Sequence, residues 1–92
     1  MAVLDDDAIR QGLEGSEWRH EDGVLMRDHD FKDFAEALAF VNRVGEEAEA
    51  ANHHPDILVH GWNKVRLMLT THSEGGVTRA DLQMSERLSS LG

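Results

Sequence analysis

Hydrophobic positions recur with two different periods along the chain, and the helical period is clearest between residues 33 and 52. Asp33 and Glu36 have the spacing of a capping box at the start of this segment. Pro55 has no amide hydrogen, so the helix is expected to end near Asn52. Apolar residues at steps of three and four predict one buried stripe: Phe34, Leu38, Val41, Val44, Ala48 and Ala51.

Two other segments alternate apolar and polar residues with a period of two, which predicts β-hairpins. In the first, strands over 17–20 and 24–31 flank Asp22 and Gly23. This pair suits a type I′ turn, because both central residues of that turn need positive φ. The second hairpin is expected over residues 56–72.

Helices are also expected at both ends of the chain. Residues 5–15 carry acids in what would be the first helical turn, where the helix dipole favours them. Near the other end, Thr78 and Asp81 again have capping-box spacing, and His72 is expected to end the preceding strand. The predicted fold is therefore an α+β two-layer domain, a four-stranded antiparallel sheet with three helices on one face, in the order α-β-β-α-β-β-α.

Composition limits the classes of protein to which the chain can belong. Its 92 residues predict a single domain over 1–92. The net charge of −9 argues against direct binding of nucleic acid or of an anionic membrane. There is no cysteine, which excludes disulfides and thiolate chemistry. An acidic N-terminus and the lack of a long apolar run predict an intracellular, cytoplasmic protein.

The chain contains six histidines, of which three are candidates for chemistry. His53 and His54 follow the long helix, and the second hairpin is expected to bring His72 close to them. Imidazole titrates near pH ~6.5, so three such groups around one pocket can act as proton donors and acceptors. The other histidines are expected to be partly exposed strand residues with no catalytic role, namely His20, His29 and His60.

Spacing alone leaves structural interpretations open for each candidate. His53 could cap the carbonyl groups at the end of the long helix, and Glu49 could orient an imidazole or simply be solvated. Trp62 could stack on a flat ligand or cover the edge of the core, and Asp81 could serve mainly as a helix cap. No metal site is expected, because the chain lacks an HExxH motif and adjacent histidines in an extended segment point to opposite sides.

The signature of the pterin-4a-carbinolamine dehydratases resembles one series of residues in this chain, namely Glu49-x3-His53-His54-Pro55 followed by Trp62, His72 and Asp81. The series covers about a third of the chain, and several fixed positions over that distance make a specific motif. Two positions depart from the pattern. Many members have Asp where this chain has Asn52, and a basic residue where it has Ala80.

The resemblance implies dehydration of 4a-hydroxytetrahydropterin to quinonoid dihydropterin, in recycling of a tetrahydrobiopterin-type cofactor, without a metal or other cofactor. It also implies these roles: His53 and His72 as the proton-transfer pair, His54 positioning the pterin, Glu49 orienting His53, Trp62 lining the pocket, and Asp81 holding a histidine or a pterin nitrogen.

Two other functions remain open for a chain with this resemblance. One is a non-catalytic interaction protein, since related proteins act as dimerisation partners of a transcription factor or assist assembly of the carbon-fixing carboxylase. The other is a pterin-binding module of a different pathway. The same resemblance implies a homo-oligomer, a dimer or tetramer, formed through the sheet.

Overall fold

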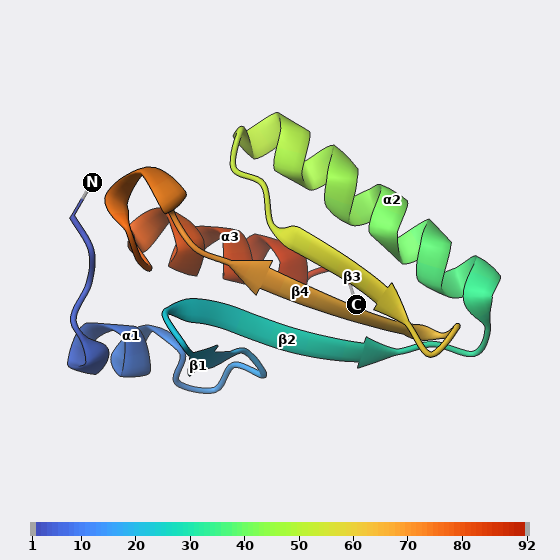
Figure 1. Cartoon of the computed structure of the whole chain (residues 1–92), viewed down its shortest axis with the longest axis horizontal. Coiled ribbons are helices and arrows are strands. Elements are labelled where there is room, and N and C mark those ends of the chain that lie inside the picture. Colours follow the sequence, from blue (N-terminus) through green and yellow to red (C-terminus); the bar gives the residue numbers. More distant parts are fainter. Residues whose placement is uncertain (1, 92) are drawn as a thin grey trace.

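The computed structural model describes residues 2–91, which fold into a sheet and helices (Figure 1). The predicted class and element order are confirmed, with one short 3₁₀-helix (η1) added. The four antiparallel strands lie in the order β1-β2-β4-β3. The elements are α1 (Asp6–Gly12), β1 (Arg19–Glu21), β2 (Val24–Asp30), α2 (Phe34–Ala51), β3 (Asp56–His60), β4 (Lys64–Leu69), η1 (His72–Glu74) and α3 (Arg79–Ser89).

The turns and caps form largely where the sequence predicts them. Asp22 and Gly23 have φ values of 49° and 77°, as a type I′ turn requires. The Asp33 carboxylate accepts a hydrogen bond from the Glu36 amide at 2.9 Å and so caps α2. The Glu36 side chain accepts from the amide of Lys32, one residue earlier than a capping box predicts. These local contacts begin α2 at the predicted residue.

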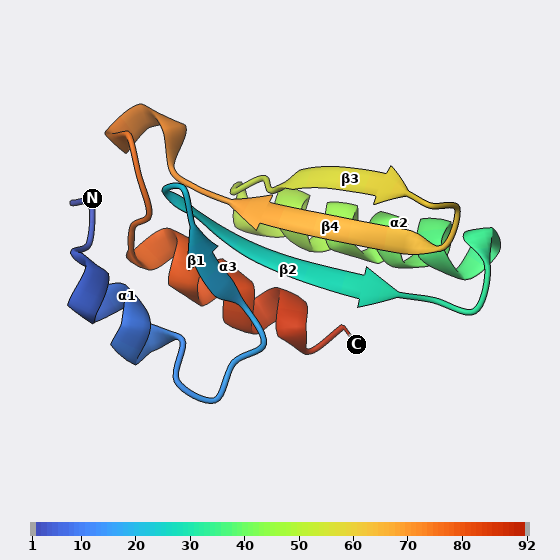
Figure 2. The same ribbon diagram turned by 60° about the horizontal axis from the view of Figure 1, so that its bottom comes forward.

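One face of the sheet packs against α2 and α3 (Figure 2). From the sheet, this core contains Leu25 of β2 and Val65, Leu67 and Leu69 of β4. The predicted stripe on α2 was partly wrong, because Phe34 and Leu38 are 49% and 41% exposed. The buried face of α2 is rotated from the predicted stripe, and it is formed by Ala37, Phe40, Val44 and Ala48.

The first helix packs against the last one rather than against the centre of the sheet. Ile9 of α1 is buried in the core. A Cβ added at Gly12 would lie 2.6 Å from Leu82 Cδ1, so the absence of a side chain at Gly12 permits this close approach. Within residues 2–91, none of the helices combines the length and the apolar character that crossing a bilayer needs.

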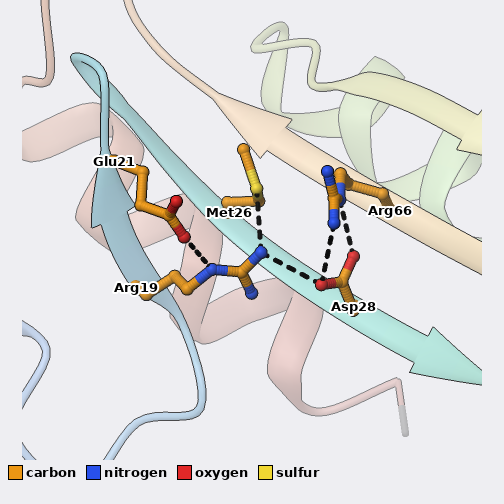
Figure 3. Close-up of polar contacts among 5 residues, drawn as sticks. All are labelled: Arg19, Glu21, Met26, Asp28 and Arg66. Atoms are coloured by element: carbon orange, nitrogen blue, oxygen red, sulfur yellow. Dashed lines mark hydrogen bonds and ion pairs between the residues drawn. The ribbon is translucent and has the colours of Figure 1, made fainter.

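The other face of the sheet carries a network of charged side chains (Figure 3). Arg66 Nε and Arg19 Nη2 lie 2.7 Å and 3.0 Å from the two carboxylate oxygens of Asp28. Hydrogen bonds from Arg66 and then Arg19 hold the pKa of Asp28 below its ordinary value, against the opposing effect of burial. Arg19 also pairs with Glu21 and contacts Met26 Sδ. Positive and negative side chains alternate in this network, which is typical of a sheet face that is not covered by helices.

His29 is buried in the core, which corrects the expectation that it is a partly exposed strand residue. It is 8% exposed, and its ring lies 4.5 Å from the ring of Phe40 and 6.0 Å from that of Phe31, centroid to centroid. Neither ring nitrogen has a hydrogen-bond partner among the described residues. Burial, and then the nearby charge of Arg27, lower the pKa of His29.

This burial predicts a loss of stability in mild acid. Because the pKa of His29 is lowered on folding, the folded chain binds fewer protons than the unfolded chain as pH falls through ~6.5. The free energy of unfolding should therefore fall below that pH, by at most about 1.4 kcal/mol per pH unit from this group. His29→Phe should reduce this dependence in urea unfolding measured from pH 7.5 to 5.5. His20→Phe, at a half-buried strand histidine, should keep the wild-type slope, and an unchanged slope in His29→Phe would contradict the prediction.

Candidate active site

The most buried part of the site is a hydrogen-bonded pair between His53 and Asp81, which lie 28 residues apart in the chain. His53 Nε2 lies 2.6 Å from Asp81 Oδ1. The Asp81 side chain is fully buried, whereas that of His53 is 20% exposed. A carboxylate inside the fold thus contacts an imidazole that still reaches the surface.

Asp81 occupies this position because it completes the capping box of α3. The amide of Thr78 donates to Asp81 Oδ2 at 2.8 Å, and the Thr71 hydroxyl donates to the same oxygen at 2.8 Å. The Thr78 hydroxyl, 2.9 Å from that of Thr71, continues the network. Asp81 is therefore both a helix cap and the partner of His53. Nothing in the sequence pattern pointed to Thr71, because its contact depends on the loop before α3.

The end of α2 directs the His53 side chain toward Asp81. Asn52 is in the left-handed conformation, with φ 51° and ψ 41°. The amide of His53 donates to the carbonyl of Ala48 at 3.1 Å, and that of Asn52 donates to the carbonyl of Glu49 at 3.2 Å, which together form a Schellman motif. The backbone of His53 thus performs the capping that its side chain could have provided, and the imidazole is available for other contacts.

Glu49 makes no side-chain hydrogen bond or ion pair with His53, contrary to what the resemblance implied. Its carboxylate pairs with Nε2 of His54. Both side chains in this pair are exposed, whereas His53 turns inward to Asp81. The adjacent histidines therefore have different partners, one inside the fold and one at the surface.

His72 lies close to the histidine pair, but not on β4 as predicted. The strand ends at Leu69, and His72 begins η1. The reason is a tight loop in which the amide of Thr71 donates to the carbonyl of Gly76 at 3.0 Å and Gly75 has φ 79°. A shallow hollow of about 240 Å³ is lined by Asn52, His53, His54, Thr70, Thr71, His72 and Ser73.

The arrangement is suited to proton transfer. Because Asp81 Oδ1 accepts a hydrogen bond, a neutral His53 carries its proton on Nε2, which leaves Nδ1 as the proton acceptor. His72 is exposed and lines the same hollow. Within residues 2–91, no group of three His, Asp or Glu side chains is placed to share a metal ion.

A larger hollow, of about 590 Å³, lies elsewhere, between the α1–β1 connection and α3. Its Arg27 side chain is already bonded to Glu17 at 2.7 Å and to Ser89 at 3.3 Å. The described residues that line it include no histidine. The smaller hollow is therefore the better candidate for acid–base chemistry.

Comparison with known proteins identifies the family of the chain. Residues 2–91 match the sequence profile of the family described as pterin 4 alpha carbinolamine dehydratase. The chain belongs to this pterin dehydratase family.

Individual relatives match almost the whole chain. A protein from Thermomicrobium roseum, named as a candidate pterin-4-alpha-carbinolamine dehydratase, is 48% identical over 99% of this chain and 98% of its own length. A solved structure from Brucella melitensis, described as a transcriptional coactivator/pterin dehydratase, matches with a TM-score of 0.88 and 30% identity over 97% of each chain. A pterin dehydratase-like protein described as a RuBisCO assembly factor matches in fold alone, with a TM-score of 0.63 and 21% identity over 80% of this chain and 84% of its own.

The structure explains the residue at one signature position of the dehydratase family, Asn52, and corrects the expected location of another, Trp62. Asn52, where many members have Asp, is the left-handed residue after α2, a position that Asn adopts readily. Trp62 does not line the histidine hollow of its own chain. It lies in the turn between β3 and β4, and the five residues of β3, which span about 16 Å, separate that turn from His54 and Pro55.

Proposed function

We propose that this protein dehydrates 4a-hydroxytetrahydropterin to quinonoid dihydropterin, in recycling of a tetrahydrobiopterin-type cofactor. The pairing of a buried carboxylate, Asp81, with His53 beside His72 is the observation that carries the proposal. Membership of the pterin dehydratase family supports the substrate class.

The reaction needs two proton transfers and no change of oxidation state. The C4a–oxygen bond breaks as a donor protonates the hydroxyl, so that water leaves. The lone pair of N5 assists this departure, and loss of the N5 proton completes the C4a–N5 double bond. His53 and His72 form the proton-transfer pair, and the more exposed His54 positions the pterin. Positioned acids and bases typically contribute ~10²–10⁴-fold in rate.

A direct assay tests the proposal. The carbinolamine is generated in the cuvette by a separate hydroxylase, and its decay is followed by absorbance with and without the purified protein. We expect decay to accelerate in proportion to the protein concentration. Pterin binding without acceleration would instead indicate a binding module. The absence of both binding and acceleration would contradict any role with this pterin.

The proposed mechanism also predicts that the rate of dehydration in this assay does not depend on metal ions. Acid–base catalysis by imidazoles requires no Lewis acid, and the described residues form no metal-binding group. We expect chelator-treated protein to keep its full rate, and elemental analysis to find no stoichiometric zinc. Activity that disappears on chelation and returns with added metal would contradict the mechanism.

A further inference from the structure

Thr71 connects the two histidines of the hollow through its side chain and its place in the chain. It directly precedes His72, in the loop that joins β4 to α3 (Figure 1). The Thr71 hydroxyl donates to Asp81 Oδ2 at 2.8 Å, and His53 Nε2 lies 2.6 Å from the other oxygen of the same carboxylate, Oδ1. One carboxylate therefore links the residue before His72 to His53.

The backbone of Thr71 closes the turn that begins with His72. Its amide donates to the carbonyl of Gly76 at 3.0 Å, and its carbonyl accepts from the amides of Glu74 and Gly75, both at 3.0 Å. Thr71 is the residue before η1, where a threonine side chain commonly caps the helix, yet among the described residues its hydroxyl makes no such bond. The turn does not use the hydroxyl, which bonds to the start of α3 instead.

The directions of the hydrogen bonds around Thr71 follow from its single hydroxyl proton. That proton is directed to the Asp81 carboxylate, which can only accept. The Thr78 hydroxyl, 2.9 Å from that of Thr71, therefore donates to the Thr71 oxygen, and it accepts from the amide of Ala80 at 3.2 Å. Thr78 is fully buried, so this end of the network is shielded from water. The orientation of Asp81 is thus fixed from the loop as well as from α3.

We propose that Thr71 is a positioning residue for the proton-transfer pair. Its hydroxyl orients the carboxylate that holds His53, and its backbone folds the turn on which His72 lies. Given the proposed function, both imidazoles need fixed places beside the pterin, because a misplacement of about 1 Å can cost roughly 10²-fold in rate. Since the hydroxyl is bonded to Asp81 and Thr78, its loss should affect kcat rather than KM.

Kinetics of Thr71 variants test the proposal. Thr71→Val keeps the branched shape and removes the hydroxyl, so kcat for dehydration should fall about tenfold, the scale of one hydrogen bond to a charged group, with KM unchanged. Thr71→Ser restores the donor and should recover most of kcat. Ser85→Ala is the control, because it removes a buried hydroxyl that donates to the carbonyl of Leu82 at 2.7 Å, and Ser85 is not among the described residues that line the histidine hollow.

Three kinetic outcomes would overturn the proposal. A raised KM with wild-type kcat in Thr71→Val would show that the hydroxyl binds the pterin directly. Failure of Thr71→Ser to recover activity would show that the hydroxyl donor is not what matters. An equal loss of kcat in Ser85→Ala would reduce the effect to a general loss of stability. Circular dichroism checks the fold of each variant, and Thr71→Ala, which cannot overfill the site, should behave like Thr71→Val.

Nitrogen-15 NMR of the histidine rings tests the positioning of His53 without any pterin. At about pH 8, where imidazole is ordinarily neutral, the wild-type protein should show the Nε2 proton of His53, protected from exchange with water by its bond to Asp81. His53→Ala identifies this signal by removing it. In Thr71→Val the proton should exchange about tenfold faster, because the carboxylate that accepts it has lost one of its donors. Thr71→Ser and Ser85→Ala should keep the wild-type signal.

The NMR measurement also separates this proposal from the proposed function. An unchanged Nε2 proton signal in Thr71→Val would overturn the positioning role of Thr71, whatever the activity of the wild-type protein. The expected change of that signal in a protein without dehydratase activity would contradict the proposed function and leave the positioning of His53 by Thr71 supported.

Discussion

Replacement of His53 by alanine is expected to lower the rate constant for pterin dehydration by about 10²- to 10⁴-fold. His53 is the imidazole that the buried Asp81 carboxylate holds in one tautomer, so its loss removes an oriented proton acceptor. His72→Ala should show a loss of similar size, because His72 lines the same hollow. Both variants should remain folded, since neither side chain is part of the hydrophobic core.

The measurement compares kcat of each variant with that of the wild-type protein, with circular dichroism as a check on the fold. His20→Ala is the matched control, because it removes a histidine of β1 that does not line the hollow. Wild-type turnover in either His53→Ala or His72→Ala would remove that residue from the proposed proton-transfer pair.

Replacement of Asp81 by alanine is expected to lower the free energy of unfolding by about 3 kcal/mol. The change removes the acceptor of the Thr78 amide and the Thr71 hydroxyl, both inside the fold, as well as the partner of His53. A domain of this size has a total stability of only about 5–10 kcal/mol, so the loss is a large fraction of it.

Urea unfolding compares the loss of stability in Asp81→Ala with that in Asp33→Ala. The comparison separates the contribution of the whole Asp81 hydrogen-bond network from that of a single helix cap. Asp33 caps α2 through one hydrogen bond to the Glu36 amide, so its loss should cost about 1 kcal/mol. Equal costs for the two variants would show that the contacts of Asp81 with Thr71 and His53 contribute nothing to stability beyond capping.

Much of the fold was predictable from the sequence because its signals are local. The turn at Asp22 and Gly23, and the caps at Asp33 and Thr78, depend on residues within four positions of one another. The period of the apolar residues predicted strands and helices in the correct order. The His53–His54 pair was identifiable by its spacing within a known signature.

Other features depended on contacts between distant segments. The rotation of α2 that exposes Phe34 and Leu38 is set by packing against the sheet, because several faces of that helix carry apolar residues. His29 is buried because β2 lies beneath Phe40 of α2, and nothing in the alternation of its strand distinguishes it from an exposed histidine.

In the candidate site, too, some features were predictable from the sequence and others depended on contacts between distant segments. Residue types and their spacing were enough to indicate which side chains could carry acid–base chemistry, because that chemistry belongs to imidazole and carboxylate groups wherever they lie. The partners of these groups followed only from the folded chain, in which Asp81 contacts His53, Glu49 contacts His54, and Trp62 lies beyond the far end of β3. A side-chain contact depends on how α2, the hairpin and α3 pack, and this packing depends on the whole core rather than on residues near the contact.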